Sequence, residues 1–339
     1  MVAAVVIVFV VLVALSAPIV FALGLSGMLG LVLGNFSLQK LPSALVAGSQ
    51  SWVLLAVPTF VFAGALMERC GMSYALVNLA RGLVGWVRGG LGMSVVLAEY
   101  FFSGISGSTI ADVSAIGSML TPPMLRAGYR PEHAASLVAS ATAMGILVPP
   151  AIFMIVLGQI MDTSVVAIFL GGFIPAAVTA ACLMAVIFLQ AHRLGWPKDE
   201  RPSWASLGVA FRASLVPLVV PVVIVLGFFF GVFTATEAGA LVAAYAVAAA
   251  VFYYRNVTVR EMWTLLHETA LLTAAVGIGL FLPPIGVGLL MALRFADVSI
   301  GRHFRAYWPY LISLLVGLLL LILFPELTLF LPRRAGLVR

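Results

Sequence analysis

Charged residues are scarce in this sequence of 339 residues. Asp, Glu, Lys and Arg together make up 9% of the chain, hydrophobic residues make up 63%, and the mean hydropathy is +1.19. A soluble domain ordinarily contains about 25% charged residues, so this composition excludes the soluble class. A membrane span needs roughly 20 apolar residues, and the chain is long enough for several. We therefore predict an all-α polytopic membrane protein embedded in a lipid bilayer.

Cysteine is also rare. The two cysteines, Cys70 and Cys182, cannot form a disulfide framework or a zinc cluster. The net charge is +6, but basic residues such as Arg81 and Arg88 stand at the ends of apolar runs. That placement is typical of loops beside membrane spans, and it disfavours nucleic acid as a partner. The sequence contains no phosphate-binding GxxxxGK[ST] loop, so nothing indicates ATP-driven transport.

Nucleophilic catalysis is disfavoured by where the histidines lie. A catalytic serine needs a base within hydrogen-bond reach. The four histidines, His133, His192, His267 and His303, all stand at predicted loops or helix ends, and none is near the serines of 103–108 in sequence. We expect no enzymatic activity and no cofactor.

A polar stretch at 103–109 interrupts two short apolar runs, 91–102 and 113–120. It carries the hydroxyl groups of Ser103, Ser106, Ser108 and Thr109. Each run is too short to span a bilayer alone, so we predict a re-entrant helical hairpin with its polar tip at 103–109. Asp112 follows the tip. A carboxylate there either faces a cavity inside the membrane or caps the helix that begins near Val113, and the two interpretations are compatible.

Two Gly-x-x-x-Pro-Pro motifs, Gly145–Pro150 and Gly279–Pro284, each interrupt an apolar run. Because proline has no N–H, each double proline deprives two preceding carbonyls of their helical donors. We predict four bare carbonyl groups, whose cost at membrane depth is several kcal/mol each unless a ligand uses them. A hard cation such as Na⁺ prefers such oxygens. The alternative is that the prolines only kink helices for packing.

The most polar segment of the chain, 193–212, is predicted to be a linker. It separates a first half, 1–192, with the hairpin and one broken helix, from a second half, 213–339, with the other broken helix. Matched helix breaks, one in each half, are the usual sequence signature of a transporter site near the bilayer midplane.

Several motifs in chain order resemble one known family. They are Phe102-Ser-Gly-Ile-Ser-Gly-Ser108, Pro123-Met124, the two Gly-x-x-x-Pro-Pro motifs and Thr234-Ala-Thr-Glu237-Ala. Together they are similar, from end to end, to the large membrane subunit of tripartite ATP-independent periplasmic (TRAP) transporters. The resemblance implies two inverted repeats, each with a re-entrant hairpin and a broken helix, that move as an elevator.

The resemblance also implies a function. It predicts a Na⁺-coupled importer of organic acids such as C4-dicarboxylates in the bacterial inner membrane, working with a periplasmic substrate-binding protein and a small membrane subunit. The implied first sodium site consists of Ser103, Ser106, Gly145, Val148 and Pro149. The implied second sodium site includes Gly279 and the residues up to Pro283. The substrate cavity is expected to include Ser108, Thr109, Asp112, Pro150 and Pro284.

The sequence departs from the family pattern at several places. Val276 runs directly into Gly277, where the family carries further helices, including the second hairpin. Leu282 replaces a usual threonine, and Glu99 is unusual before the tip. The second repeat is therefore expected to be shortened. Two alternatives follow: a truncated membrane scaffold that does not transport, or a stand-alone symporter of sodium and divalent anions.

Overall fold

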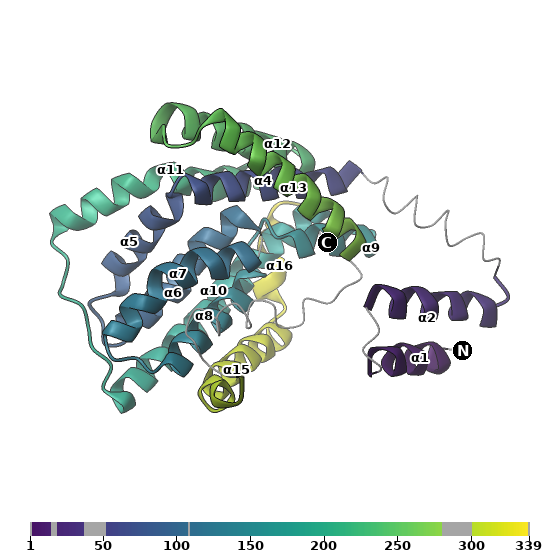
Figure 1. Cartoon of the computed structure of the whole chain (residues 1–339), viewed down its shortest axis with the longest axis horizontal. Helices are drawn as coiled ribbons and strands as arrows, with labels where there is room; N and C mark the ends of the chain where they lie inside the picture. Colours follow the sequence, from purple (N-terminus) through teal and green to yellow (C-terminus); the bar gives the residue numbers. More distant parts are fainter. Residues whose placement is uncertain (1, 15–18, 37–51, 108, 280–299, 338–339) are drawn as a thin grey trace.

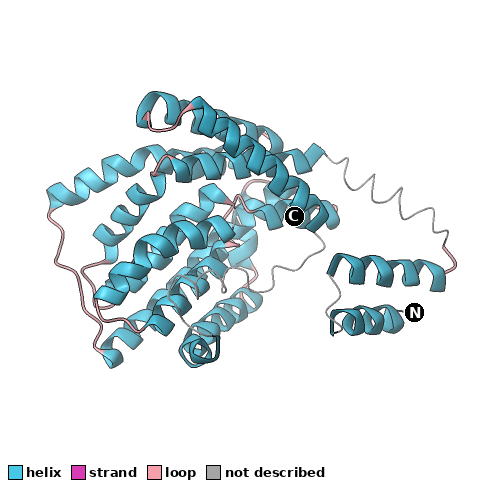
Figure 2. Cartoon of the chain, in the orientation of Figure 1, coloured by secondary structure: helices cyan, strands magenta, loops and turns pink. Residues whose placement is uncertain are grey.

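The structure, a computed structural model, describes residues 2–14, 19–36, 52–107, 109–279 and 300–337. Every regular element in these ranges is helical (Figure 2). This confirms the prediction of an all-α protein. The predictions for Ser108, Pro283 and Pro284 fall outside the described residues.

Within the described ranges, four helical segments are long and apolar enough to cross a membrane. They are η1–α4 (Trp52–Leu55 and Ala56–Arg69), α10 (Val165–Leu194), α11 (Trp204–Phe229) and α12–η2 (Ala235–Ala248 and Ala249–Tyr254). The later part of α15 (Ile300–Leu323) and α16 (Glu326–Arg334) form a fifth candidate, bent by 57°. The described residues thus confirm a multi-pass membrane protein.

Shorter or less apolar helices complete the described part of the chain. They are α1 (Val2–Ala14), α2 (Ile19–Leu33), α5 (Met72–Val84), α6 (Gly90–Ser106), α7 (Thr109–Arg126), α8 (Pro131–Gly145), α9 (Ile152–Ile160) and α13 (Val259–Gly279). Helices α1 and α2 pack side by side, and Figure 1 shows this pair standing apart from the main bundle.

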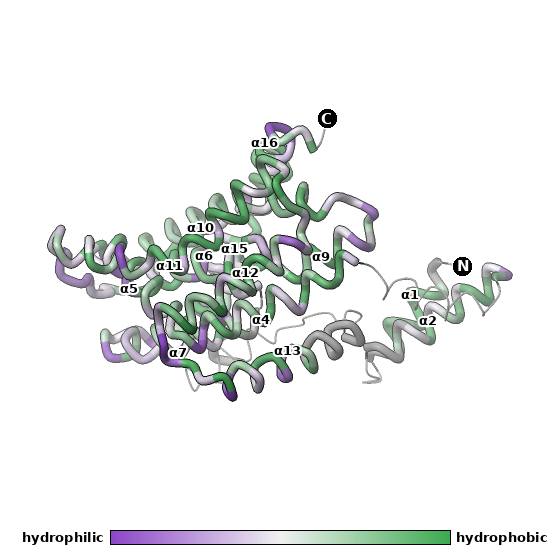
Figure 3. The backbone as a smooth tube through the Cα atoms, turned by 90° about the horizontal axis from the view of Figure 1, so that it is seen from above, coloured by the Kyte–Doolittle hydropathy of each residue, from purple (hydrophilic) through white to green (hydrophobic). Residues whose placement is uncertain are grey.

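Helix α6 lies at the centre of the bundle. It packs against α4, α5, α7, α8, α10 and α11, and nearly all of its residues are buried. The outer helices instead expose large apolar side chains, such as Val222 of α11 and Phe252 of η2. Figure 3 shows hydrophobic colouring along the helices and hydrophilic colouring mainly at their ends and connections. This distribution suits a molecule whose outer surface faces lipid.

The predicted hairpin is present as α6 and α7, which pack against each other. Gly107 ends α6 in the left-handed conformation, with φ of +60°, and the chain reverses there. The second arm is longer than expected, because α7 continues through Pro122 and Pro123 to Arg126. This arm therefore begins before and ends after the apolar run 113–120 on which it was predicted. Membrane helices tolerate proline where neighbouring groups re-satisfy the backbone.

The connection after α10 is shorter than the predicted linker 193–212. Helix α10 continues to Leu194 and α11 begins at Trp204. The connection is held against the turn between α5 and α6: the Arg81 guanidinium donates to Asp199 at 2.9 Å, and the Asp199 N–H donates to the Gly85 carbonyl at 3.0 Å. The division of the chain into two repeats stays a prediction.

Helix α13 replaces two predicted elements. The sequence indicates an amphipathic connector up to Glu268 and a new span from Thr269, but one helix runs from Val259 to Gly279. It begins cleanly because the Glu261 carboxylate accepts from the Thr258 N–H at 2.8 Å. The predicted break at 283–284 lies beyond the described part of this helix.

Candidate functional site

The tip of the hairpin meets the break between α8 and α9. The Ser103 hydroxyl donates to the Gly145 carbonyl at 2.8 Å, across 42 positions of sequence. The Ile152 N–H donates to the Gly107 carbonyl at 3.4 Å. The break occupies residues 146–151, of which Val148, Pro149, Pro150 and Ala151 are buried. Two interrupted segments that the sequence places far apart therefore form one buried unit.

Glycine makes this close approach possible at two positions. A Cβ atom at Gly107 would lie 2.7 Å from the Pro150 carbonyl oxygen. A Cβ atom at Gly145 would lie 2.7 Å from Glu99 Oε1 and 2.9 Å from Ser103 Oγ. All three distances are shorter than van der Waals contact, so a larger residue at Gly107 or Gly145 would force the tip and the break apart.

The Gly145 carbonyl is not bare, which corrects the sequence prediction. Pro149 does remove its helical donor, but the Val148 N–H donates to it at 2.9 Å and the Ser103 hydroxyl supplies a second donor. The local turn and the facing hairpin thus satisfy the group that the proline frees. The Ser103 hydroxyl donates its only proton in this bond, so its oxygen lone pairs can still face a cation.

Ser106 and Asp112 connect the two arms of the hairpin at its tip through a hydrogen bond. The Ser106 hydroxyl donates to Asp112 Oδ1, and both residues are buried. Asp112 lies in the first turn of α7, where the helix N-terminus favours a negative charge. Asp112 is buried, which is compatible with a carboxylate that faces the interior. The other interpretation, a cap on a helix that begins near Val113, was wrong, because α7 begins at Thr109 and Asp112 lies inside its first turn.

Glu99 is a carboxyl group that the sequence marks as unusual before the tip but that was not included in the predicted site. It lies on α6 one turn before Ser103, and its side chain is fully buried. No backbone N–H or hydroxyl group of the described residues donates to either carboxylate oxygen. The signal available in the sequence was the spacing of four residues from Ser103, which places both side chains on one face of a helix.

The remaining predicted residues are less informative. Thr109 begins α7 and is partly buried. Gly279 ends α13, and the rest of the predicted second sodium site lies outside the described residues. The structure therefore tests the convergence of the first site only. Among the described residues, no group of three or more His, Cys, Asp or Glu side chains could hold a metal ion.

The Thr234–Glu237 motif forms a helix cap. The Thr234 N–H donates to Glu237 Oε2 at 2.7 Å, and the Glu237 N–H donates to the Thr234 hydroxyl at 3.4 Å, which is the reciprocal pattern of a capping box. Glu237 therefore acts as a capping residue at the start of α12.

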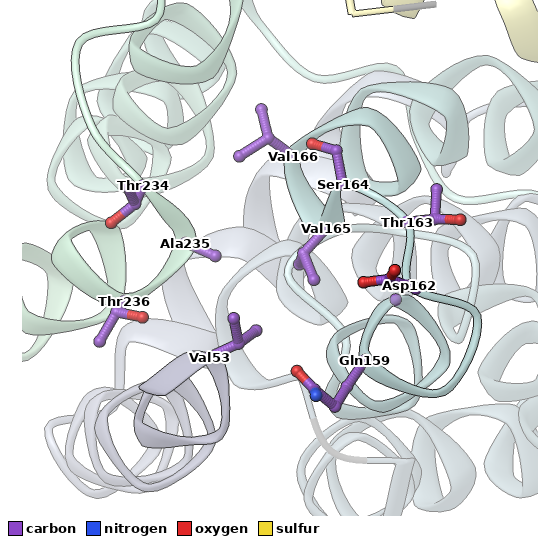
Figure 4. Close-up of a pocket in the computed structure, with 11 residues that line it drawn as sticks. Val53, Gln159, Asp162, Thr163, Ser164, Val165, Val166, Thr234, Ala235 and Thr236 are labelled. Atoms are coloured by element: carbon purple, nitrogen blue, oxygen red, sulfur yellow. The ribbon is translucent and has the colours of Figure 1, made fainter. Parts of the chain in front are cut away.

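A cavity of about 370 Å³ lies beside this cap, between the loop after α9 and the start of α12 (Figure 4). Its polar lining includes Gln159, Asp162, Ser164, Thr234 and Thr236. No residue of the predicted sodium sites lines this cavity, so it is separate from the contact between tip and break.

The fold and the buried contact define a polytopic helical membrane protein with a re-entrant hairpin packed on a broken helix. A family model described as "Tripartite ATP-independent periplasmic transporter, DctM component" matches residues 6–278 and 271–327. The chain belongs to this family, whose members are large permease subunits in the bacterial inner membrane. The two matched segments overlap at 271–278. This overlap includes Val276 and Gly277, between which the sequence predicts that helices of the family pattern are missing.

Three relatives illustrate the range of the family. The chain is 37% identical over 265 residues to the 2,3-diketo-L-gulonate TRAP transporter large permease protein YiaN of Escherichia coli, covering 78% of this chain and 62% of that protein. It is 37% identical over 253 residues to the C4-dicarboxylate TRAP transporter large permease protein DctM of Pseudomonas aeruginosa, covering 74% and 59%. It is 31% identical over 283 residues to the sialic acid TRAP transporter permease protein SiaT of Haemophilus influenzae, covering 82% and 46%. The chain thus spans less than two thirds of the length of each.

Proposed function

We propose that the chain is the large permease subunit of a Na⁺-coupled secondary importer of organic acids, for which C4-dicarboxylates are the first candidates. The observation that carries this proposal is the buried contact between the hairpin tip and the helix break, made by the Ser103 hydroxyl and the Gly145 carbonyl. A membrane protein has little reason to bury interrupted backbone and several hydroxyl groups together unless a ligand uses them.

The proposed ion site combines two kinds of oxygen. Ser103 directs its hydroxyl proton to the Gly145 carbonyl, which leaves the Ser103 oxygen able to face a cation, and the Ser106 hydroxyl lies beside it with its proton directed to Asp112. The break supplies backbone carbonyl groups from the buried segment that contains Val148 and Pro149. Oxygens of this kind can replace the hydration shell of a monovalent ion.

The substrate class and the partners are inferred from the relatives. Their names give diketogulonate, C4-dicarboxylates and sialic acid as substrates, and ectoine in the case of UehC of Ruegeria pomeroyi. Most of these are organic acids. We infer a periplasmic substrate-binding protein and a small membrane subunit as partners, elevator movement of the hairpin-bearing part, and transport rather than catalysis.

Uptake measurements test this function. Cells that express the chain with its small subunit and binding protein should take up labelled succinate in the presence of Na⁺, and Ser106→Ala or Pro149→Ala should abolish the Na⁺-dependent part. Ser118→Ala is a matched control, because Ser118 is an exposed serine on the same hairpin. Unchanged uptake in both site variants would contradict a Na⁺ site at the hairpin tip.

A second candidate function is a membrane scaffold that does not transport. The observation that favours it is the internal junction near Val276 and Gly277, where the two segments matched by the family model, 6–278 and 271–327, overlap. A scaffold would form a stable complex with the small subunit yet show no Na⁺-linked uptake. A stand-alone symporter, the third possibility raised by the sequence, would transport in proteoliposomes without any binding protein.

A further inference from the structure

Glu99 and Asp112 are two buried carboxyl groups in the same interior region, and their surroundings differ. Asp112 accepts a hydrogen bond from Ser106 and lies at the N-terminal turn of α7. The positive end of a helix and a hydroxyl donor both stabilise a negative charge. Groups of the hairpin itself therefore stabilise a negative charge on Asp112.

Glu99 has neither a helix N-terminus nor a hydroxyl donor beside it to stabilise a negative charge. It lies within α6, away from either helix end, with its side chain 0% exposed and no backbone N–H or hydroxyl group of the described residues donating to either oxygen. The group that acts on it is the Asp112 carboxyl, both through its charge and at side-chain hydrogen-bonding range. Glu68 of α4 acts on Asp112 in turn, so the neighbouring groups are acidic. No Lys, Arg or His among the described residues forms an ion pair with Glu99.

The Glu99 carboxylate also points at the break. An added Cβ atom at Gly145 would meet Glu99 Oε1 at 2.7 Å and Ser103 Oγ at 2.9 Å, so both oxygens face the same glycine. The Ser103 hydroxyl reaches the Gly145 carbonyl directly. The Glu99 carboxylate and the Ser103 hydroxyl thus converge on Gly145, where α8 ends and the buried backbone of the break begins.

We propose that Glu99 is a direct ligand of the Na⁺ ion bound between the hairpin tip and the helix break, and that it supplies the negative charge of that site. This inference rests on the proposed function. A buried ionised carboxylate without a counter-charge is costly, and a bound cation provides the missing partner. The hydroxyl and carbonyl ligands are neutral, so Glu99 is the ligand that balances the ion's charge.

The consequence is a site that differs from one built of neutral oxygens alone. A carboxylate ligand strengthens attraction to a small hard cation in a low-dielectric interior.

Na⁺-dependent thermal stability of the purified full chain in detergent micelles tests this assignment, with choline chloride holding ionic strength constant. Wild-type protein should gain stability with rising Na⁺, because ligands that bind only the folded state raise its melting temperature. Glu99→Gln keeps the size and one oxygen but loses the charge, and it should need about tenfold or more Na⁺ for the same gain. Glu200→Gln, an exposed carboxylate on the connection after α10, should respond as wild type does.

Two further variants separate the possible failures. If Ser106→Ala weakens the Na⁺ response and Glu99→Gln does not, the ion site stands and the role of Glu99 is wrong. If wild-type protein shows no Na⁺ response, both the ion site and the role of Glu99 fail. Should Glu99→Gln not fold, Glu99→Asp keeps the charge but shortens its reach; a weaker Na⁺ response supports direct ligation, and a wild-type response contradicts it.

Discussion

Gly145 is the residue on which the candidate site depends most. Its carbonyl joins the last turn of α8 to the hairpin through Ser103, and its missing side chain gives room to Ser103 and Glu99. The same residue therefore provides both a backbone oxygen and the space in which other oxygens approach it. Glycine is the residue type that can do both.

A substitution at Gly145 should separate the tip from the break. Gly145→Ala places a methyl group 2.7 Å from Glu99 Oε1, so we expect destabilisation of about 1–3 kcal/mol by overpacking. The melting temperature of the purified protein measures it. Gly208→Ala is the control: Gly208 is exposed inside α11 with open space around it, so alanine should stabilise that helix by about 0.5–1 kcal/mol. Equal melting temperatures for Gly145→Ala and wild type would contradict the described packing.

The sequence predicted the convergence of serines and broken backbone but not its details. The Ser/Gly tip and the Gly-x-x-x-Pro-Pro motif indicated Ser103, Ser106 and Gly145. The donors of the Gly145 carbonyl were not predictable, because one comes from a local turn and the other from a helix 42 positions away. Glu99 was missed as a ligand because burial depends on the six helices packed around α6, which no local pattern records.

At the scale of elements, the interruption between α8 and α9 is what holds the site open. A continuous helix would pair the Gly145 carbonyl with the N–H of residue 149 and move Ile152 away from Gly107. The two prolines prevent this pairing because they lack N–H groups. The hairpin tip then docks on the interruption, as the bond from the Ile152 N–H to the Gly107 carbonyl shows.

Replacing both prolines should join the two helices. In Pro149→Ala/Pro150→Ala the new N–H groups can complete the helical ladder, so hydrogen exchange of the amides at 146–152 should slow by about tenfold or more. Pro175→Ala serves as control, because Pro175 already lies within the continuous helix α10 and exchange at 146–152 should not change. Faster exchange at 146–152 in the double variant would show that the tip, and not the prolines, keeps the helices apart.

Helix α13 offers a pH-dependent test outside the candidate spans. The Thr258 N–H, followed by the Arg69 guanidinium and the Thr258 hydroxyl, lowers the pKa of Glu261 to about 2 from an ordinary value of 4.5. A lowered pKa means that the carboxylate stabilises the fold fully above about pH 4.5 and loses this contribution as the pH falls toward 2.

The melting temperatures of wild type and Glu261→Gln should therefore differ most above about pH 4.5 and converge toward pH 2. Glu268→Gln, at an exposed position of the same helix, gives the control curve. A difference between wild type and Glu261→Gln that stays constant across this range would show that the capping carboxylate does not act through its charge.

Some helix boundaries could not be predicted from sequence patterns alone. The extension of α7 through Pro122 and Pro123 was not predicted, since proline is a boundary signal in a single sequence and becomes tolerable only when neighbouring helices complete the packing. The start of α13 was misplaced because its Thr258–Glu261 cap looked like part of a polar connector.

At the scale of the whole molecule, length is the unusual feature. Family membership covers nearly the entire chain, yet the chain spans 62% of the E. coli relative. The sequence places the missing segment between Val276 and Gly277, in the second half. The hairpin, the break and Glu99 all lie before this point, so we expect the proposed ion site to be testable independently of transport.

A chimera tests whether the missing segment limits transport. Inserting the corresponding helices of the E. coli permease between Val276 and Gly277 should raise Na⁺-dependent uptake above that of the unmodified chain, because a second hairpin would complete the second repeat. An inserted segment of equal length from an unrelated helical hairpin is the control. No gain from the permease segment would argue that the shortened second half is not what limits the chain.

Equilibrium binding of radioactive sodium to the purified chain tests the central claim most directly. The account predicts saturable binding to wild-type protein, strong weakening in the Ser103→Ala/Ser106→Ala double variant, and normal binding in Ser118→Ala. Saturable binding that the double variant retains in full, or no saturable binding to wild type, would contradict a sodium site between the hairpin tip and the helix break.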